Sequence, residues 1–474
     1  MKIKSLSLIV APILLTPAAG FAADAIDVSG SATLGIHAVD NHDNSAKFQE
    51  YRDLSDGVFG EINLNTYKGS HYFEMEGKNI GLDDQNYSLK GGEYNKFKYS
   101  FSYDEILHNL SFDNKTFYSG VGTKNLNIIG GAVAPESDWT SFDYKIERKK
   151  YGGNIEISMG SPYFVSVGVN RLETTGVKPL GTGGFGGQTE MPEPVNYTTD
   201  DLTMQAGYRS KTFIASVSGL LSSFNNDNTY LTWEDRTNVG TMDTNTLPPE
   251  NDYGKIGARL TWRALPYRST LGITGSYVHL SNDYTAADLN LTPAPGDSTS
   301  FSGDIDYTNA SVTLSSLLTN LLDSRIYYKY LKRNNKSSVV NFGTESNADN
   351  LFEYNTDDAG IDLGYKLPKR TKAQIGYEYL NTDRTNRLDA TNTTDNSIYV
   401  QLKNNYLDYL TAKVRYKHLD RSSDFGNSNA GTTPTANDGY IDRFVRRFDA
   451  TDKKQAANVE IKEDDLLLIL KHVT

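Results

Sequence analysis

The segment from Lys96 to Glu105 reads K-F-K-Y-S-F-S-Y-D-E, and this alternation constrains the fold more than any other feature of the chain. Aromatic side chains occupy every second position, beginning with Phe97, Tyr99 and Phe101, and lysine or serine lies between them. Successive side chains of a β-strand point to opposite sides, so the segment predicts a strand with one apolar and one polar face.

The same two-faced pattern recurs along most of the chain, for example at residues 142–146, 165–169, 256–262 and 373–379. Tight turns are predicted at Ser161-Pro162, Arg209-Ser210, Leu265-Pro266, Leu322-Asp323, Leu367-Pro368 and Asn405-Tyr406. Between the turns lie long polar stretches, roughly 174–199, 224–252, 281–304, 333–356, 381–396 and 419–442. We therefore predict an all-β protein, a large antiparallel transmembrane β-barrel of roughly 20 strands with short periplasmic turns and long extracellular loops. This strand count includes one extra strand within residues 112–130.

The amino terminus has the organisation of a secretory signal. A short positive segment, Met1 to Lys4, precedes an apolar run from Leu6 to Leu15 and small residues up to Ala22. The apolar run is about half of the ~20 residues that a membrane-spanning helix needs. We expect residues 1–22 to be a signal peptide and residues 23–474 to be a multi-pass barrel in the bacterial outer membrane.

Charge and cysteine content exclude several functions. The net charge of -12 argues against a nucleic-acid partner, which would favour a basic surface. The chain has no cysteine, so it has no disulfide, no thiolate metal site and no covalently attached c-type haem. The mean hydropathy of -0.52 does not exclude a barrel, because a barrel strand shows lipid only every second residue.

A barrel of this size would have a wide lumen. Twenty strands spaced about 4.8 Å apart and tilted about 40° give a backbone diameter near ~40 Å. Side chains would reduce the lumen to roughly 30 Å, which is wider than a sugar or an ion needs. We expect that the lumen has an occupant.

No motif points to catalysis or ligand binding. The run Gly181 to Gly187 lacks the Lys-Ser/Thr of a phosphate loop and is interpreted as a flexible outer loop. The acidic runs at 40–43 and 437–439 lack the spacing of a calcium loop. The histidines are scattered, and His108 is interpreted as a loop residue, although a pair with Asp104 or Glu105 is conceivable. We expect a non-enzymatic chain with no catalytic, cofactor-binding or metal-ligating residue.

Two remaining side-chain patterns concern the wall of the predicted barrel. Charges on the polar faces have mixed sign, as at Lys96, Lys98, Asp143, Lys145 and Glu147, and form no ring of a single sign. Tyrosines near strand ends, at Tyr72, Tyr208 and Tyr365, suit the aromatic girdles of a membrane barrel.

Several segments resemble the amino-terminal signature of the MtrB/PioB family of decahaem-associated outer-membrane β-barrel proteins. They are Lys47 to Leu54 (K-F-Q-E-Y-R-D-L), Asn79 to Tyr87, Gly91 to Tyr94, Tyr103 to Glu105 with His108, and Tyr118 to Gly122. A later likeness lies at Arg446 to Lys453. The resemblance implies a barrel that sheathes a periplasmic multihaem c-type cytochrome, with a second multihaem cytochrome docking outside, so that electrons cross the outer membrane. The haem would belong to the partner, and this chain would bind no cofactor.

Within the signature, Glu50, Arg52 and Asp53 are candidate partner-contact or structural residues, and an internal salt-bridge role is an equal alternative. The rival function is a general diffusion porin for small hydrophilic solutes. A surface hydrolase is a third class, without a supporting motif.

The chain departs from the family in two respects. The amino-terminal C-x-x-C of some relatives is absent, and relatives continue for more strands beyond the Phe448-Asp449 region. The carboxyl-terminal run from Leu466 to Leu470 is apolar rather than alternating and lacks a terminal aromatic residue. A short family member, a truncated product and a barrel too narrow for a full decahaem partner are three open interpretations.

Overall fold

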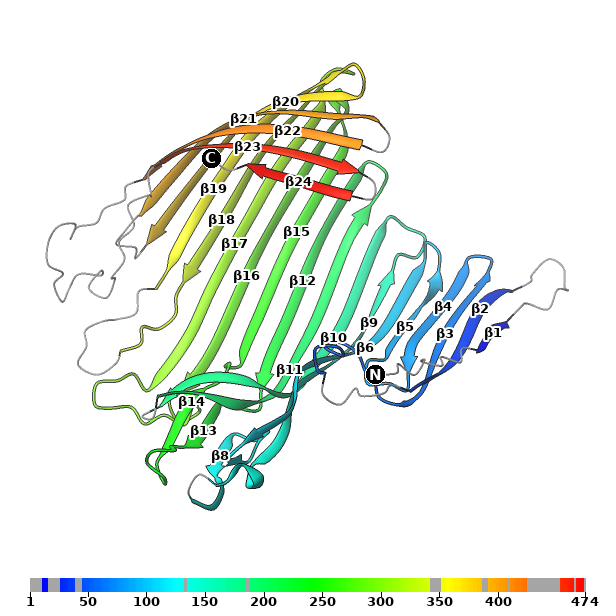
Figure 1. The fold of residues 1–474 in the computed structure, drawn as a ribbon. Helices are drawn as coiled ribbons and strands as arrows, with labels where there is room; N and C mark the ends of the chain where they lie inside the picture. The colour runs from blue at the N-terminus through cyan, green and yellow to red at the C-terminus, as the bar shows by residue number, and fades with distance from the viewer. Residues whose placement is uncertain are drawn as a thin grey trace, which may run out of the picture. The chain divides into compact units, whose positions relative to one another are not determined.

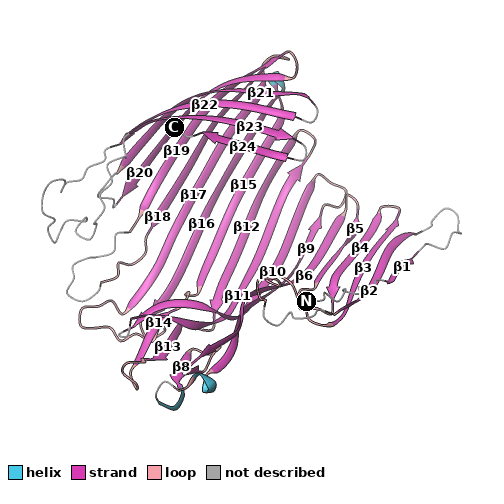
Figure 2. Ribbon diagram, in the orientation of Figure 1, coloured by secondary structure: helices cyan, strands magenta, loops and turns pink. Residues whose placement is uncertain are grey.

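The structure is a computed structural model that describes residues 11–15, 26–38, 45–131, 134–184, 187–341, 351–385, 391–407, 410–423, 452–463 and 466–472. The helices in these ranges are single 3-10 turns, and none is long and apolar enough to cross a membrane. The chain divides into unit 1 (1–206, 219–254 and 281–302) and unit 2 (207–218, 255–280 and 303–474). Twenty strands make up the large antiparallel sheets of these units, and four short strands form a separate sheet (Figure 1, Figure 2). The predicted all-β fold class is confirmed.

Unit 1 contains a series of neighbouring strands that pair antiparallel in chain order. They are β2 (Asp27–His37), β3 (Gly57–Lys68), β4 (His71–Ile80), β5 (Asn86–Glu93), β6 (Phe97–Thr116), β9 (Thr140–Ile157) and β10 (Tyr163–Gly184). The short strand β1 (Ala11–Leu15) pairs with β2 and falls within the segment predicted to be a signal peptide. The division between the units passes through β11 (Gly187–Arg209), β12 (Phe213–Asn226), β15 (Asn251–Leu265), β16 (Ser269–Thr285) and β17 (Ser300–Leu317).

Unit 2 also has strands that pair antiparallel in chain order, beginning with β17. They continue as β18 (Leu322–Asn335), β19 (Glu353–Leu367), β20 (Thr371–Thr385), β21 (Asn392–Leu407), β22 (Leu410–Ser423), β23 (Asp452–Glu463) and β24 (Leu466–His472). The apolar run at the carboxyl end is therefore a strand that pairs with β23.

The small sheet in unit 1 has its own apolar core. It consists of β7 (Tyr118–Ser119), β8 (Asn125–Ile128), β13 (Tyr230–Glu234) and β14 (Met242–Thr246). Its core contains Tyr118, Leu126, Ile128, Met191, Leu231, Trp233 and Leu247, all buried. The 3-10 turns are η1 (Ile129–Gly131), η2 (Glu136–Asp138) and η3 (Pro266–Arg268).

The predicted alternation of short and long connections is confirmed, with corrections at residues 112–130, 174–199 and 381–396; the last of these lies in β20 up to Thr385 and in β21 from Asn392. Short hairpin connections follow Ile157, Arg209, Leu265, Leu317 and Leu367, close to the predicted turns. The prediction of an extra strand of the large sheet within residues 112–130 is wrong. β6 extends through Thr116 by itself, and β7 and β8 belong to the small sheet.

The second correction concerns the stretch 174–199, which was predicted to be a loop. It lies mainly in β10 and β11, so the glycine run is not an outer loop at its described ends: Gly181 to Gly184 close β10 and Gly187 opens β11. Pairing with β9 continues to Val177. Backbone pairing can continue where both faces of a strand contact water, and there the apolar alternation that identifies a strand disappears.

The large sheet of each unit has one face rich in exposed apolar side chains, here called the apolar face. Its opposite face is polar. In unit 1, Phe101, Ile155 and Val169 are about half exposed, and in unit 2 the same is true of Ile375 and Val400. Exposed apolar surface in water costs about 25 cal/mol per Å². So many large apolar side chains on one face therefore indicate an apolar medium, as the alternation predicts.

Candidate functional site

The polar face of unit 2 carries ion pairs between directly opposed residues of neighbouring strands. Arg325 on β18 lies opposite Asp362 on β19, and its Nε donates to Oδ2 at 2.7 Å. Further opposed pairs are Lys329–Asp358 at 2.8 Å and Arg421–Asp395 at 2.6 Å, and Lys372 on β20 reaches across β19 to Asp323 on β18 at 2.8 Å. The charges of each of these pairs cancel at a distance, whereas Lys366, Lys372, Lys403 and Lys413 lie directly opposite one another on the same face.

Tyrosine rings cover glycines on the same polar face. Tyr327 lies opposite Gly360, and Tyr399 lies opposite Gly376. A Cβ added at Gly360 would lie 2.5 Å from the Tyr327 ring, so the ring occupies the space that a side chain would need. Arg415 lies over the Tyr399 ring at 3.9 Å from its centroid. Because these rings lie along the sheet, they project little from its polar face.

The signature segments of unit 1 cover the free edge of β6. β5 pairs with β6 only as far as Asn86 opposite Asp104, whereas β6 continues to Thr116. Beyond that point, the Glu105 amide donates to the Gln85 carbonyl and the Asn109 amide donates to the Glu50 carbonyl, both at 2.9 Å. These two loops, residues 45–56 and 79–86, are here called the edge cap. The edge cap satisfies backbone donors that would otherwise leave an open strand edge.

The candidate residues have different positions in the edge cap. The Asp53 carboxylate accepts hydrogen bonds from the Asp83 amide at 2.8 Å and from the Ser55 amide at 2.9 Å, and so joins the two loops. The Glu50 side chain pairs with Lys47 and lies 3.5 Å from His108 Nε2. The Arg52 side chain is exposed and forms no hydrogen bond or ion pair with the described residues. The structure thus unites Glu50 and Asp53 within the cap and leaves Arg52 facing solvent.

His108 is a correction to the sequence analysis. It lies on β6 rather than in a loop, because β6 is longer than its apolar alternation indicates. Its carboxylate neighbour is Glu50, not Asp104 or Glu105, and its ring stacks on Tyr51 with centroids 4.8 Å apart. The signature had placed Glu50 and His108 in the same set of segments, but nothing in their spacing indicated this contact.

An aromatic row marks one border of the apolar face in unit 1. Tyr87, Tyr103 and Tyr151 are directly opposed on β5, β6 and β9, with centroids 6.0 and 6.4 Å apart. The next pair on the same face is Glu105 and Lys149, whose charged atoms lie 3.3 Å apart. A tyrosine row followed by charge is typical of a membrane–water interface.

The predicted girdle residues are confirmed in part. Tyr365 is exposed on the apolar face of unit 2, and Tyr208 contacts Phe213, which in turn meets Trp262 edge-on. Tyr72 is wrong as a girdle residue. It lies opposite Tyr67 and Gly92, on the polar face.

The structure brings together one group with metal-binding side chains that the sequence did not reveal. His279 Nδ1 lies 2.9 Å from Asp306 Oδ1 and 3.5 Å from Asp304 Oδ1. The ammonium of Lys336 lies 2.6 Å from Asp306 Oδ2, so a cation already balances this group. The contact depends on the register of β16, β17 and the residues after β18, which sequence spacing does not give. The acidic runs at 40–43 and 437–439 lie outside the described residues.

Comparison with known proteins decides the family. The sequence model of the family described as "Putative outer membrane beta-barrel porin, MtrB/PioB" matches residues 40–458. The chain belongs to the MtrB/PioB family. It is therefore an outer-membrane β-barrel protein, and the predicted resemblance, fold class and location are confirmed. The MtrB/PioB family is a family of membrane barrels and not a class of enzymes.

A curated member of the family also matches the chain. Outer membrane protein MtrB of Shewanella baltica (strain OS185) is 21% identical over 416 residues, which are 80% of this chain and 58% of that protein. The chain thus spans less than two thirds of the length of this MtrB/PioB relative.

Solved structures give weaker likenesses. The closed form of the ferric-catecholate import receptor Fiu from E. coli K12 has a TM-score of 0.44 and 11% identity, covering 94% of this chain and 69% of that one. The siderophore receptor PiuA of Acinetobacter baumannii has a TM-score of 0.42 and 10% identity, covering 93% and 68%. At these scores, the likenesses add nothing to the MtrB/PioB assignment.

Proposed function

We propose that this chain is a non-enzymatic outer-membrane sheath that houses and aligns multihaem c-type cytochromes for electron transfer across the membrane. A periplasmic multihaem cytochrome would occupy the lumen, and an extracellular one could dock outside. The haem would belong to these partners, since a chain without cysteine cannot attach c-type haem. Residues 1–22 would be removed on export.

The observation that carries the proposal is the set of ion pairs formed within the polar wall of unit 2, in a chain of this family. Arg325 is matched with Asp362 across strands, and tyrosine rings cover Gly360 and Gly376. Solute selectivity in a pore commonly depends on charged rings of one sign. The ion-paired part of the wall lacks such a field and suits a large partner that lies against it and is held by shape.

The test is the recovery of a haem protein. The chain, carrying an affinity tag, is extracted from outer membranes in mild detergent and purified, and the product is stained for haem after electrophoresis. We expect a multihaem cytochrome in an amount matching the chain. A colourless chain obtained in normal yield would overturn the proposal.

The word porin in the family description favours a second candidate function, a general diffusion porin. Measurements of conductance distinguish this porin from the sheath. In planar bilayers, the purified complex should be nearly closed, because the cytochrome fills the lumen. The same chain from cells that cannot attach haem should conduct strongly. Equal, large conductance of both preparations would support the porin.

Substitution of Arg52 gives the most direct test of whether the signature residues contact the partner. Its side chain is exposed and forms no hydrogen bond or ion pair with the described residues, so Arg52→Ala should leave the edge cap intact. If Arg52 touches the partner, the variant should release cytochrome several-fold more easily in rising salt, since an exposed ion pair is screened. Unchanged retention would assign the signature residues to structure alone.

A further inference from the structure

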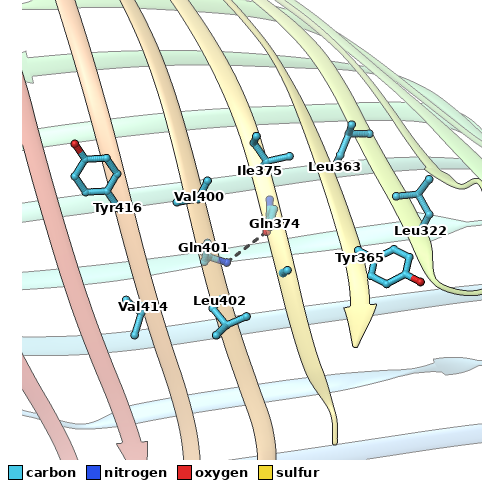
Figure 3. A pocket seen from close by; sticks show the side chains of 11 residues that line it. Leu322, Leu363, Tyr365, Gln374, Ile375, Val400, Gln401, Leu402, Val414 and Tyr416 are labelled. Carbon is cyan, nitrogen blue, oxygen red and sulfur yellow. Dashed lines mark hydrogen bonds between the residues drawn. The ribbon is translucent and has the colours of Figure 1, made fainter. Parts of the chain in front are cut away.

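A hollow of about 560 Å³ opens on the apolar face of unit 2 (Figure 3). Its lining comes from β18 to β22 and consists of aliphatic and tyrosine side chains with two glutamines. The size lies within the range of about 300–1,000 Å³ that small-ligand pockets have.

A small residue creates the hollow. Ala373 on β20 is directly opposed by Tyr365 on β19 and by Leu402 on β21. Both neighbours are about half exposed and rise above the methyl group of Ala373. Ile375 and Val400 continue the lining along the same face. The apolar band is thus interrupted by a depression at Ala373.

The two glutamines of the lining have their side chains on the opposite, polar face of the sheet. Gln401 Nε2 donates to Gln374 Oε1 at 3.3 Å, and Gln374 Nε2 donates to the Tyr399 hydroxyl at 3.0 Å (Figure 3). Both amide nitrogens therefore have acceptors within the protein. An occupant of the hollow would meet aliphatic and tyrosine side chains, which favours an apolar ligand.

The hollow lies close to the short turns. Leu322 begins β18, Tyr365 is two residues before the end of β19, and Ala373 is two residues after the start of β20. Short turns are at the periplasmic end of such barrels, so the hollow belongs to the inner half of the membrane. The leaflet on that side consists of phospholipid, whereas lipopolysaccharide occupies the outer leaflet.

We propose that this hollow is a seat for one acyl chain of an inner-leaflet phospholipid. The apolar face of an outer-membrane barrel contacts lipid, and the hollow is continuous with that face. A water-soluble partner cannot reach it from either side of the membrane. The seat is independent of the electron-transfer proposal, because it lies on the opposite face of the sheet from the polar wall.

Filling the hollow tests the seat. Ala373→Leu places a larger side chain between Tyr365 and Leu402. The matched control is Ala359→Leu, because Ala359 is an alanine on the same face of β19 that does not line the hollow. Folding of each variant is checked by heat-dependent migration in electrophoresis, which distinguishes folded barrels from unfolded chains.

The measurement is the phospholipid that stays bound after extensive washing in mild detergent, quantified by mass spectrometry with lipopolysaccharide measured separately. Wild type and Ala359→Leu should retain a tightly held phospholipid, and Ala373→Leu should retain several-fold less. Equal retention by all three, or retention of lipopolysaccharide alone, would overturn the proposal.

A second measurement needs no variant. A phospholipid with a photoreactive diazirine in its acyl chain is irradiated with the wild-type protein in vesicles. Cross-links should concentrate on peptides containing residues 363–375 and 400–414. Cross-links spread evenly over the apolar face, or confined to lipopolysaccharide analogues, would contradict a seat.

Discussion

At the scale of residues, the polar wall depends on a close fit between side chains and glycines. Tyr399 occupies the space above Gly376 so fully that a Cβ there would lie 2.3 Å from a ring carbon. The sequence places both residues on polar faces, but only the register of β20 against β21 makes them neighbours. The glycine is needed here for space rather than for backbone freedom.

Gly376→Ala should therefore destabilise the protein. Overpacking of this kind typically costs about 1–3 kcal/mol. Gly272→Ala is the matched control, because the nearest heavy atom to its added Cβ is 3.9 Å away. Urea unfolding in detergent should show a lower midpoint for the first variant only. Equal midpoints would show that the Tyr399 ring moves aside freely.

Two neighbouring carboxylates in the edge cap should respond oppositely to pH. Partial burial acts to raise the pKa of Asp53, but hydrogen bonds from Asp83 and Ser55 outweigh it and hold the pKa below its usual value. Burial raises the pKa of Asp84, whose Oδ1 has no hydrogen-bond partner. Asp53 thus stabilises the cap above its unfolded pKa of about 3.9, and this contribution is lost as pH falls through its lower folded pKa. Asp84 destabilises the cap increasingly as pH rises from its unfolded pKa through its raised folded pKa.

At neutral pH, Asp53→Asn should loosen the edge cap and Asp84→Asn should tighten it. Loss of a buried hydrogen-bond acceptor costs roughly 1–3 kcal/mol. The readout is hydrogen exchange at the Glu105 and Asn109 amides, which the cap engages. At pH below both folded pKa values, the variants should approach wild type. Changes of the same sign at neutral pH would contradict this account.

At the scale of elements, the alternation of apolar and polar residues identifies the parts of strands that lie in the membrane. It does not identify the parts that extend beyond the membrane. β6 alternates clearly from Phe97 to Tyr103, yet the strand continues to Thr116. Its outer part is polar or irregular because the surrounding medium no longer requires an apolar face. The open edge of this outer part is covered by the edge cap, which is why two distant segments of the signature lie together. The two loops of the edge cap could be identified in the sequence, but the contact between them could not be predicted from it.

Neighbouring residues of β6 should therefore tolerate lysine very differently. Phe101→Lys places a charge on the lipid side, where the cost falls from roughly 2–4 kcal/mol at the midplane to about 0–1 kcal/mol near the interfaces. Ser102→Lys adds the same charge to the polar face and should be nearly neutral. The amount of heat-modifiable barrel in outer membranes measures assembly. Equal assembly of both variants would contradict the assignment of the two faces.

At the scale of the whole molecule, the chain is acidic overall, and several carboxylates of the polar face in unit 2 are paired with cations on the next strand. The Asp362 side chain is 6% exposed, pairs with Arg325 and accepts a hydrogen bond from the Tyr399 hydroxyl. Mixed charge on the strands was predicted from the sequence, and the cross-strand pairing was not. The pairing depends on the strand register, because a slip of one residue would move every side chain of the strand to the opposite face.

Breaking one pair should change ion selectivity in the absence of a partner. Asp362→Asn leaves the Arg325 charge unmatched, so the empty channel should shift towards anions. The double variant Asp362→Asn with Arg325→Gln removes both charges and should restore the original selectivity. Reversal potentials in a salt gradient measure the shift. A double variant that stays shifted would show that Asp362 acts on the wall as a whole.

The sequence by itself determined that this is an exported, all-β membrane protein of the MtrB/PioB family, because lipid on one side and water on the other impose a period of two on every spanning strand. The tertiary structure alone decided where the strands end, which loops cover the edge of β6, which charges pair and where the lipid face is hollow. These features depend on contacts between residues far apart in the chain, and such contacts are set by strand register, which leaves no periodic mark in the sequence.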